Sequence, residues 1–243
     1  MNGIFTDFLN KSLPMPTEGP SNVYQAAQLL SGLRDAEIGR VIFAPRFSPR
    51  YVTGDGSIRV FLRVRNNIFR TIKPHIPSGI RYSLAADILM YPGCFNDPLT
   101  ERLTLPGSRY VMVSLPFPNF YDEIWKDINK LVYHTGLRPV FTEFNRYLLT
   151  YSDTEIKKLL KVPGAAFQFN VRSLDYKDTV KFVISVVSEG KQVVFGTGAR
   201  CVGKYEAEMK PHFKLLKRAL GETDFNLLML SANNFCRPRN VPR

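Results

Sequence analysis

The sequence has no long hydrophobic run and little cysteine. No stretch of its 243 residues approaches the roughly 20 apolar residues of a membrane span. The first residues lack a basic segment followed by an apolar one, so we expect a cytoplasmic protein without a signal peptide. Cys94, Cys201 and Cys236 are far apart and form neither a disulfide framework nor a zinc motif. Neither a P-loop nor a dinucleotide-binding fingerprint is present. These absences exclude membrane-spanning, disulfide-rich and nucleotide-binding classes.

Histidine is also scarce, whereas positive charge is abundant. His75, His134 and His212 include no pair at the spacing of metal ligands, so we expect no catalytic or metal-binding histidine. Lysine and arginine number 33 against 21 acidic residues, which gives a net charge of +12. This surplus favours anionic partners, namely nucleic acid, anionic lipid, polyanionic sugar or an acidic protein surface, without choosing among them.

Short apolar runs alternate with amphipathic segments along the chain. Strands are predicted over residues 41–45, 83–90, 110–116, 138–144, 165–171 and 192–198. Helices are predicted over residues 22–38, 57–73, 121–135, 152–162, 178–189, 204–220 and 223–235. Alternation of this kind indicates a parallel sheet, and six or seven strand–helix units favour a closed barrel. We therefore predict one domain over residues 1–243, with a basic tail at 232–243.

Several short motifs follow one another in an order that is informative as a set. They are Gly19-Pro20, Arg40–Arg46 (RVIFAPR), Ala85-Ala86-Asp87, Gly136–Val140 (GLRPV), Asn145-Arg146-Tyr147, Gln168–Leu174 (QFNVRSL) and Phe195–Arg200 (FGTGAR). In this order they resemble the polymerase-and-histidinol-phosphatase (PHP) superfamily, in particular its bacterial tyrosine-phosphatase branch encoded with capsule and exopolysaccharide genes. The resemblance covers nearly the whole chain. It implies an α/β fold, a distorted (β/α)7 TIM-like barrel, with a metal cluster at the C-terminal ends of the strands.

The residues at the family's metal-ligand positions differ from the family pattern. The resemblance places the following residues there: Thr6 and Phe8 for a His-x-His pair, Arg46 and Glu143 for single histidines, Asp87 for a bridging glutamate, and Arg200 for the last histidine. Arginine stays protonated and cannot ligate a metal. We therefore predict no metal, no cofactor and no catalytic residue, but a vestigial pocket in which Arg46 and Arg200 neutralise Asp87 and Glu143.

Three arginines suggest a further use of this pocket. Arg46, Arg146 and Arg200 can form a metal-free site for phosphate or carboxylate, because guanidinium groups bind such oxyanions in a bidentate manner. The alternative is that they only pair with neighbouring carboxylates and carbonyls.

The helix predicted over residues 57–73 has a basic face. Arg59, Arg63, Arg70 and Lys73 recur at helical spacing, and residues 57–86 contain no Asp or Glu. A solvated helix face is the ordinary explanation, and a docking surface for an anionic partner is the alternative. The candidate partners are an acidic protein, an anionic polysaccharide and a membrane surface. The family context implies the phosphorylated tail of a tyrosine kinase as an example of the first. Sequence-specific DNA is not expected, because no DNA-reading motif is present.

Together these observations predict a catalytically degenerate tyrosine phosphatase homologue, a pseudophosphatase that acts by binding. The resemblance implies a role in exopolysaccharide or capsule biosynthesis. A first alternative is a weakly active metal-dependent protein-tyrosine phosphatase or phosphoesterase that holds one ion with Asp7, Asp87 and Glu143. A second is a binder of anionic polymers or nucleic acid, which rests on charge alone.

Overall fold

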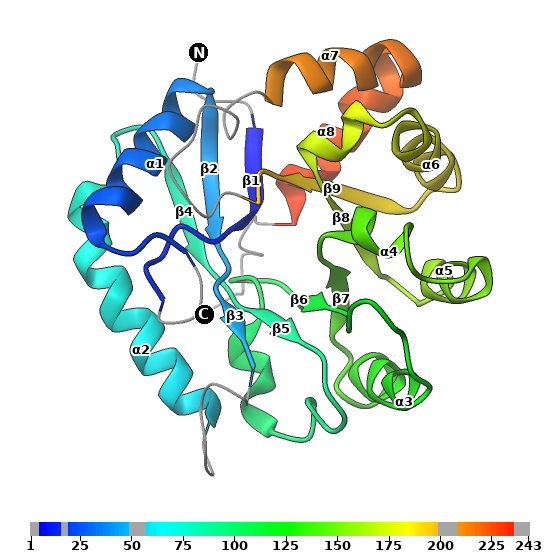
Figure 1. The fold of residues 1–243 in the computed structure, drawn as a ribbon, viewed down its shortest axis with the longest axis horizontal. Coiled ribbons are helices and arrows are strands. Elements are labelled where there is room, and N and C mark those ends of the chain that lie inside the picture. Colours follow the sequence, from blue (N-terminus) through cyan, green and yellow to red (C-terminus); the bar gives the residue numbers. More distant parts are fainter. Residues whose placement is uncertain (1–4, 16–18, 49–56, 199–208, 236–243) are drawn as a thin grey trace, which may run out of the picture.

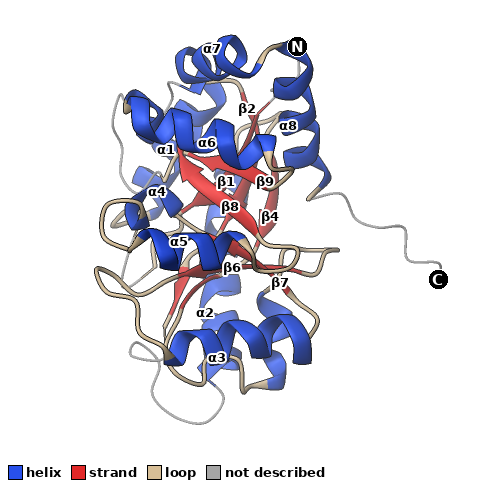
Figure 2. Cartoon of the chain, turned by 90° about the vertical axis from the view of Figure 1, so that its right-hand side faces the viewer, coloured by secondary structure: helices blue, strands red, loops and turns tan. Residues whose placement is uncertain are grey.

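The computed structural model describes residues 5–15, 19–48, 57–198 and 209–235. Their strands gather at the centre of the molecule, and helices surround them (Figures 1 and 2). The strands are β1 (Phe5–Asn10), β2 (Ile38–Phe43), β3 (Arg46–Phe47), β4 (Arg81–Leu84), β5 (Asp87–Leu89), β6 (Tyr110–Ser114), β7 (Arg138–Phe141), β8 (Ala166–Asn170) and β9 (Gln192–Gly196). Every ladder that joins them is parallel, as the alternation of strands and helices predicts.

The longer helices cover the outside of the strands. They are α1 (Val23–Asp35), α2 (Ser57–Ile72), α3 (Glu123–Asn129), α5 (Asp153–Leu160), α6 (Lys177–Ser188), α7 (Met209–Leu220) and α8 (Glu222–Asn234). Shorter turns are η2 (Lys73–His75), η3 (Pro98–Leu103), η4 (Lys130–His134), α4 (Phe144–Tyr147) and η5 (Val171–Asp175). The capping box that Ser152 and Glu155 form is present at the start of α5.

The ladders form two sheets, in the orders β1-β2-β4 and β3-β5-β6-β7-β8-β9. The first sheet continues into the second, because β3 follows β2 and β5 follows β4 along the chain. Backbone hydrogen bonds from Ala85 to Phe43 (2.8 Å) and from Asp87 to Pro45 (3.0 Å) link these segments. The strands that the structure describes thus occupy seven positions around the centre, and β1 lies beside β9 (Figure 1).

The α/β barrel-like fold predicted from the sequence is confirmed, with corrections in detail. The strand predicted over residues 83–90 is two strands, separated at Ala85-Ala86. Residues 121–135 form α3 and then a π-helical turn, η4, instead of one continuous helix. Of the helix predicted over 204–220, the described part begins at Met209.

Successive side chains along each strand point alternately into an inner core and an outer core. Ile42 and Ala44 belong to a small inner cluster with Met112, Val140 and Val194, whereas their neighbours Val41 and Phe43 pack in the outer core. Phe235, which follows α8, joins the inner cluster through ring contacts to Phe8 and to Tyr110 at the start of β6. The N-terminal end of the barrel is therefore filled with apolar side chains, and polar residues lie at the opposite ends of the strands.

Candidate functional site

A fully buried carboxylate, Asp87, lies at the centre of a polar cluster. Its Oδ2 accepts a hydrogen bond from Nζ of Lys11 at 3.1 Å, and neither side chain is exposed to solvent. The guanidinium of Arg46 donates from Nε and Nη2 at 3.4 and 3.3 Å. The hydroxyl of Ser114 donates at 2.7 Å and that of Thr142 at 2.9 Å. Both carboxylate oxygens are thus held by cations and hydroxyls of the chain itself.

The order of the strands explains why these residues meet. Lys11 directly follows β1, Arg46 opens β3, Ser114 ends β6 and Thr142 directly follows β7. Arg46 and Asp87 are register partners across the β3–β5 ladder. Because β3 and β5 continue β2 and β4, these residues all lie towards the C-terminal ends of parallel strands. They therefore come together on one face of the barrel, where such folds place their sites.

The surroundings of Asp87 favour its ionised form. Burial by itself raises the pKa of this carboxyl. The charges of Lys11 and Arg46, with the hydrogen bonds from Ser114 and Thr142, outweigh burial and lower the pKa to about 2. The cluster therefore contains a permanent anion at neutral pH, balanced by two adjacent cations.

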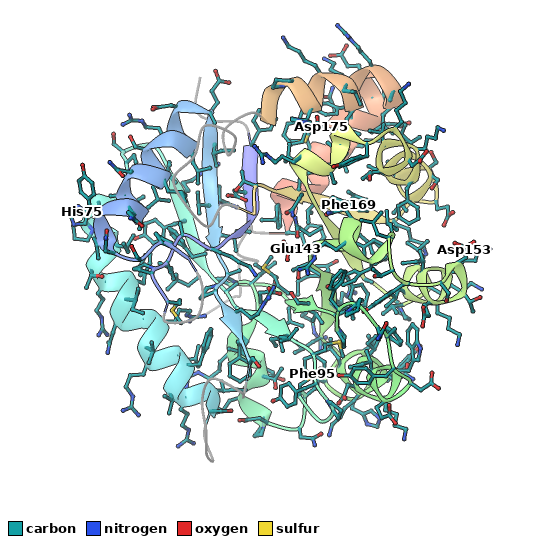
Figure 3. The ribbon with its side chains drawn as sticks, in the orientation of Figure 1. His75, Phe95, Glu143, Asp153, Phe169 and Asp175 are labelled. Atoms are coloured by element: carbon teal, nitrogen blue, oxygen red, sulfur yellow. The ribbon has the colours of Figure 1, made fainter. Side chains whose placement is uncertain are left out.

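A second buried carboxylate, Glu143, lies near the middle of the ring of strands (Figure 3). Its backbone is left-handed (φ 50°, ψ 41°), and its N–H donates to Oε1 of Gln168 at 2.7 Å. Its carboxylate pairs with Arg146 at 3.0 Å and Arg46 at 3.6 Å and accepts from Asn170 at 3.3 Å. Arg46 thus bridges the two buried carboxylates.

The amino-terminal strand contributes differently from the sequence prediction. Phe8 is fully buried in the inner core, and Thr6 is buried within β1. Asp7 accepts hydrogen bonds from the backbone N–H and the hydroxyl of Thr197 at 2.8 and 2.7 Å, which ties β1 to the end of β9. The residue that reaches Asp87 is Lys11, and no sequence motif marks it.

The remaining predicted anion-binding residues differ in how well they are placed. Arg146 is partly exposed and lies over the ring of Phe117, 4.5 Å from its centroid, while it pairs with Glu143. Arg46 is about one-fifth exposed. Arg200 lies outside the described residues.

The donor set of this cluster does not fit a divalent metal ion. Among the described residues, no group of three or more His, Cys, Asp or Glu side chains is arranged to hold a metal. Asp87 and Glu143 are both occupied by side-chain cations. Like charges at ~4 Å repel by roughly 4 kcal/mol per unit-charge pair near a protein surface, and a dication doubles this. An ion beside Asp87 would therefore have to displace Lys11 or Arg46.

The helix that carries the predicted basic face, α2, lies on the outside of the strands (Figure 1). Arg59, Arg63 and Arg70 on α2 and Lys73 in η2 are exposed. Arg65 is not part of that face: it is buried and donates to the carbonyl of Ala85 at 2.8 Å. Burial, followed by the charge of Arg102, lowers its pKa to about 10.

Comparison with known proteins shows a family and a structural likeness that covers nearly the whole chain. The family described as "Capsular polysaccharide synthesis, CpsB/CapC" matches residues 5–235. A crystal structure from work on YwqE of Bacillus subtilis and CpsB of Streptococcus pneumoniae, described there as metal-dependent tyrosine phosphatases, has a TM-score of 0.75. The two chains are 17% identical, over 98% of this chain and 96% of that one.

Other likenesses are weaker. A DAHP synthase of Thermotoga maritima has a TM-score of 0.47 at 13% identity, over 90% of this chain and 71% of that one. An N-acetylneuraminate lyase of Fusobacterium nucleatum has a TM-score of 0.44 at 12% identity, over 95% and 79%. No curated protein matches the sequence. Among the described residues, no helix is both long and apolar enough to cross a bilayer.

Proposed function

The chain belongs to the CpsB/CapC family of capsular polysaccharide synthesis, and from this premise we propose that it is a pseudophosphatase of that family. In this proposal it contributes to capsule or exopolysaccharide synthesis by binding a partner and does not hydrolyse phosphate esters. Fold alone does not fix function, so the proposal rests on the chemistry of the strand-end cluster.

The observation that carries the proposal is the buried pairing of Asp87 with Lys11 and Arg46. Metal-dependent hydrolysis needs ligands that are free to hold an ion, which then activates a water molecule. Here the cations that balance the carboxylate are covalent parts of the chain. Each roughly 1.4 kcal/mol of repulsion weakens binding of the ion about tenfold, so a site that opposes its metal by several kcal/mol would hold little metal and support little hydrolysis.

The exposed basic face of α2 and η2 is the proposed binding surface. Within the part of the chain that the structure describes, Arg59 and Arg63 form no ion pair, and Arg70 donates a hydrogen bond to Oδ1 of Asn67 at 2.9 Å. Unpaired cations on one side of a helix attract an anionic partner and raise its rate of association. We propose an acidic or tyrosine-phosphorylated protein segment as that partner.

The partly exposed Arg46 and Arg146 offer a separate, smaller site. Both guanidinium groups contact Glu143, so an incoming phosphate or carboxylate would compete with this residue. Occupation by a small anion is accordingly proposed as a weak, secondary property of the pocket.

Metal analysis combined with an activity assay tests the loss of catalysis. We expect less than stoichiometric Mn²⁺, Mg²⁺ or Zn²⁺ in the purified protein, and no turnover of p-nitrophenyl phosphate in added Mn²⁺. The melting temperature should also not rise with Mn²⁺, because an ion that binds only the folded state would stabilise it. Bound metal with turnover that Asp87→Ala abolishes would establish the weakly active phosphatase instead.

Capture experiments at low and raised ionic strength test the binding surface. We expect an acidic or phosphorylated peptide to be retained at low salt and released at raised salt. The triple charge reversal of Arg59, Arg63 and Arg70 to Glu should abolish retention, whereas Lys181→Glu on the opposite exposed helix α6 should not. Retention by the triple variant would exclude α2 as the surface. Anionic vesicles or polysaccharide that bind better than the peptides would assign it to another class of partner.

A further inference from the structure

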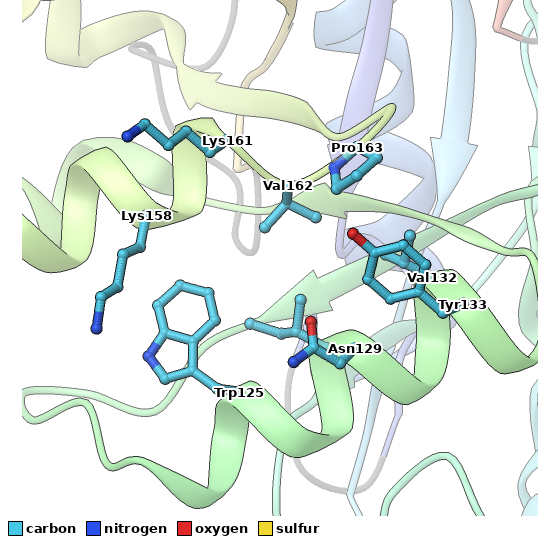
Figure 4. Close-up of a pocket in the computed structure, with 9 residues that line it drawn as sticks. Trp125, Asn129, Val132, Tyr133, Lys158, Lys161, Val162 and Pro163 are labelled. Atoms are coloured by element: carbon cyan, nitrogen blue, oxygen red, sulfur yellow. The ribbon is translucent and has the colours of Figure 1, made fainter.

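A small pocket lies in the outer helical layer, on elements that do not contribute to the cluster around Asp87. It opens between α3–η4 and the end of α5 and has a volume of about 220 Å³ (Figure 4). Ile128, Val132 and Val162 supply aliphatic lining, called here the apolar floor, and the polar Asn129 also lines the pocket (Figure 4). None of its lining residues belongs to the strand-end cluster or to the basic face of α2.

Two aromatic side chains border the pocket (Figure 4). Trp125 in the first turn of α3 is half-buried, and Tyr133 in η4 is 69% exposed. Residues 130–134 form a π-helical turn, a rare conformation that occurs often at functional sites. A large aromatic left mostly in solvent beside an apolar floor is a feature of surfaces that anchor a partner.

The other side of the pocket is cationic. Lys158 and Lys161 on and after α5 line it, and Nζ of Lys158 lies 5.8 Å from the centroid of the Trp125 ring. Neither lysine pairs with a carboxylate among the residues that the structure describes, and both are exposed. Long lysine side chains can pack their methylenes on apolar surface and keep the ammonium group free. An apolar floor with an unpaired cationic rim is complementary to an apolar side chain with acidic neighbours.

The volume sets the size of the occupant. Small-molecule sites usually measure about 300–1,000 Å³, so about 220 Å³ suits one side chain better than a whole ligand. We propose that this pocket is a docking site for an acidic peptide segment of a partner protein, which inserts one aromatic side chain between Trp125 and Tyr133. Carboxylates beside the inserted residue then pair with Lys158 and Lys161.

The single tryptophan of the chain makes this proposal directly measurable, because all indole fluorescence comes from Trp125. The probe is a synthetic peptide with one Phe flanked on both sides by Glu and Asp, titrated into the full-length protein. We expect a saturable change in the emission of Trp125 and weaker binding at raised ionic strength. The same peptide with Ala in place of Phe should bind at least about tenfold more weakly, the equivalent of 1.4 kcal/mol.

Charge reversals on α5 provide a matched comparison. Lys158→Glu and Lys161→Glu should each raise the dissociation constant by about tenfold or more. Lys157→Glu changes a neighbouring exposed lysine that does not line the pocket, and it should leave the constant within about twofold. All three positions are exposed, so each variant should retain the fold, which circular dichroism checks.

Three results would overturn the proposal. One is the absence of a Trp125 signal with the Phe peptide at millimolar concentration. Another is equal loss of binding in Lys157→Glu and Lys158→Glu, which would indicate general charge attraction. The third is a change in Trp125 emission that depends on protein concentration in the absence of peptide and coincides with dimer formation in sedimentation equilibrium. That result would assign the pocket to a second copy of the chain. None of these depends on metal content, on phosphatase activity or on the α2 variants.

Discussion

Replacement of Lys11 by Met keeps the length of the side chain and removes its charge. Both Lys11 and Asp87 are fully buried, and their charged atoms are 3.1 Å apart. Removing one partner of a buried pair costs about 3–5 kcal/mol, because the other charge is left uncompensated. Arg46 still contacts Asp87 at 3.3 Å, so we expect a value near the lower limit, about 3 kcal/mol. In a chain of this size, about 3 kcal/mol corresponds to a melting temperature lower by roughly 6–12 °C.

The double variant Lys11→Met/Asp87→Asn separates the ion pair from general damage to the core. Removing both charges leaves no uncompensated group from this pair, so the double variant should lose less stability than the sum of the two single variants. Urea unfolding followed by circular dichroism measures all three. Lys181→Met serves as the control, because its pair with Asp178 is exposed and contributes little. If the stability losses of the two single variants add exactly in the double variant, the ion pair does not stabilise the cluster as described. A single variant as stable as the parent protein would refute it equally.

The same carboxylate predicts how stability depends on pH. The pKa of Asp87 is lowered from an ordinary value near 3.8 to about 2 in the folded protein. Its contribution is therefore present above about pH 4 and is lost as the pH falls towards 2, because the unfolded state takes up the proton first. Asp87→Asn should lack this part of the acid dependence in urea titrations between about pH 5 and pH 2. An unchanged acid slope in that variant would show that other carboxylates account for it.

Three further variants or treatments test other parts of the structure. Tyr147→Phe removes a buried hydroxyl that accepts a hydrogen bond from the N–H of Leu115 at 2.9 Å. The free energy of unfolding measured in urea should therefore fall by about 1–3 kcal/mol. Burial raises the pKa of the Cys94 thiol to about 12, so peptide mapping after iodoacetamide treatment should find Cys94 modified only in denaturant. Ser152→Ala removes the capping box with Glu155, and unfolding should show a loss of about 1 kcal/mol; full stability would contradict the assigned cap.

The periodicity of the sequence predicts most of the helices and strands and their order. Apolar runs with alternating environment mark β2, β6 and β9, and the Ser-x-x-Glu pattern marks the start of α5. β3 has two residues and is too short to leave a periodic signal, and the sequence does not separate β5 from β4 within the strand predicted over residues 83–90. The π-helical turn at η4 has no composition that separates it from the α-helix before it.

The site shows where sequence reasoning stops. Collinear motifs single out Arg46, Asp87 and Glu143, and the structure places all three together. Lys11, Ser114 and Thr142 join them only because the register of neighbouring strands aligns their ends, which no local pattern records. A lysine after an apolar strand would ordinarily be expected in solvent, because burial of its charge requires a partner distant in sequence. The left-handed backbone of Glu143 is likewise a property of the folded chain.

The ion pair that Lys11 forms with Asp87 connects the two sheets through side chains, in addition to the backbone hydrogen bonds that link them. Lys11 extends from β1 in the three-stranded sheet, and Asp87 belongs to the six-stranded one. If one sheet opened by itself, the charge of Lys11 or Asp87 would remain buried without its partner. The barrel's two halves are thereby made energetically interdependent, which favours a single cooperative transition over the stepwise loss of one half.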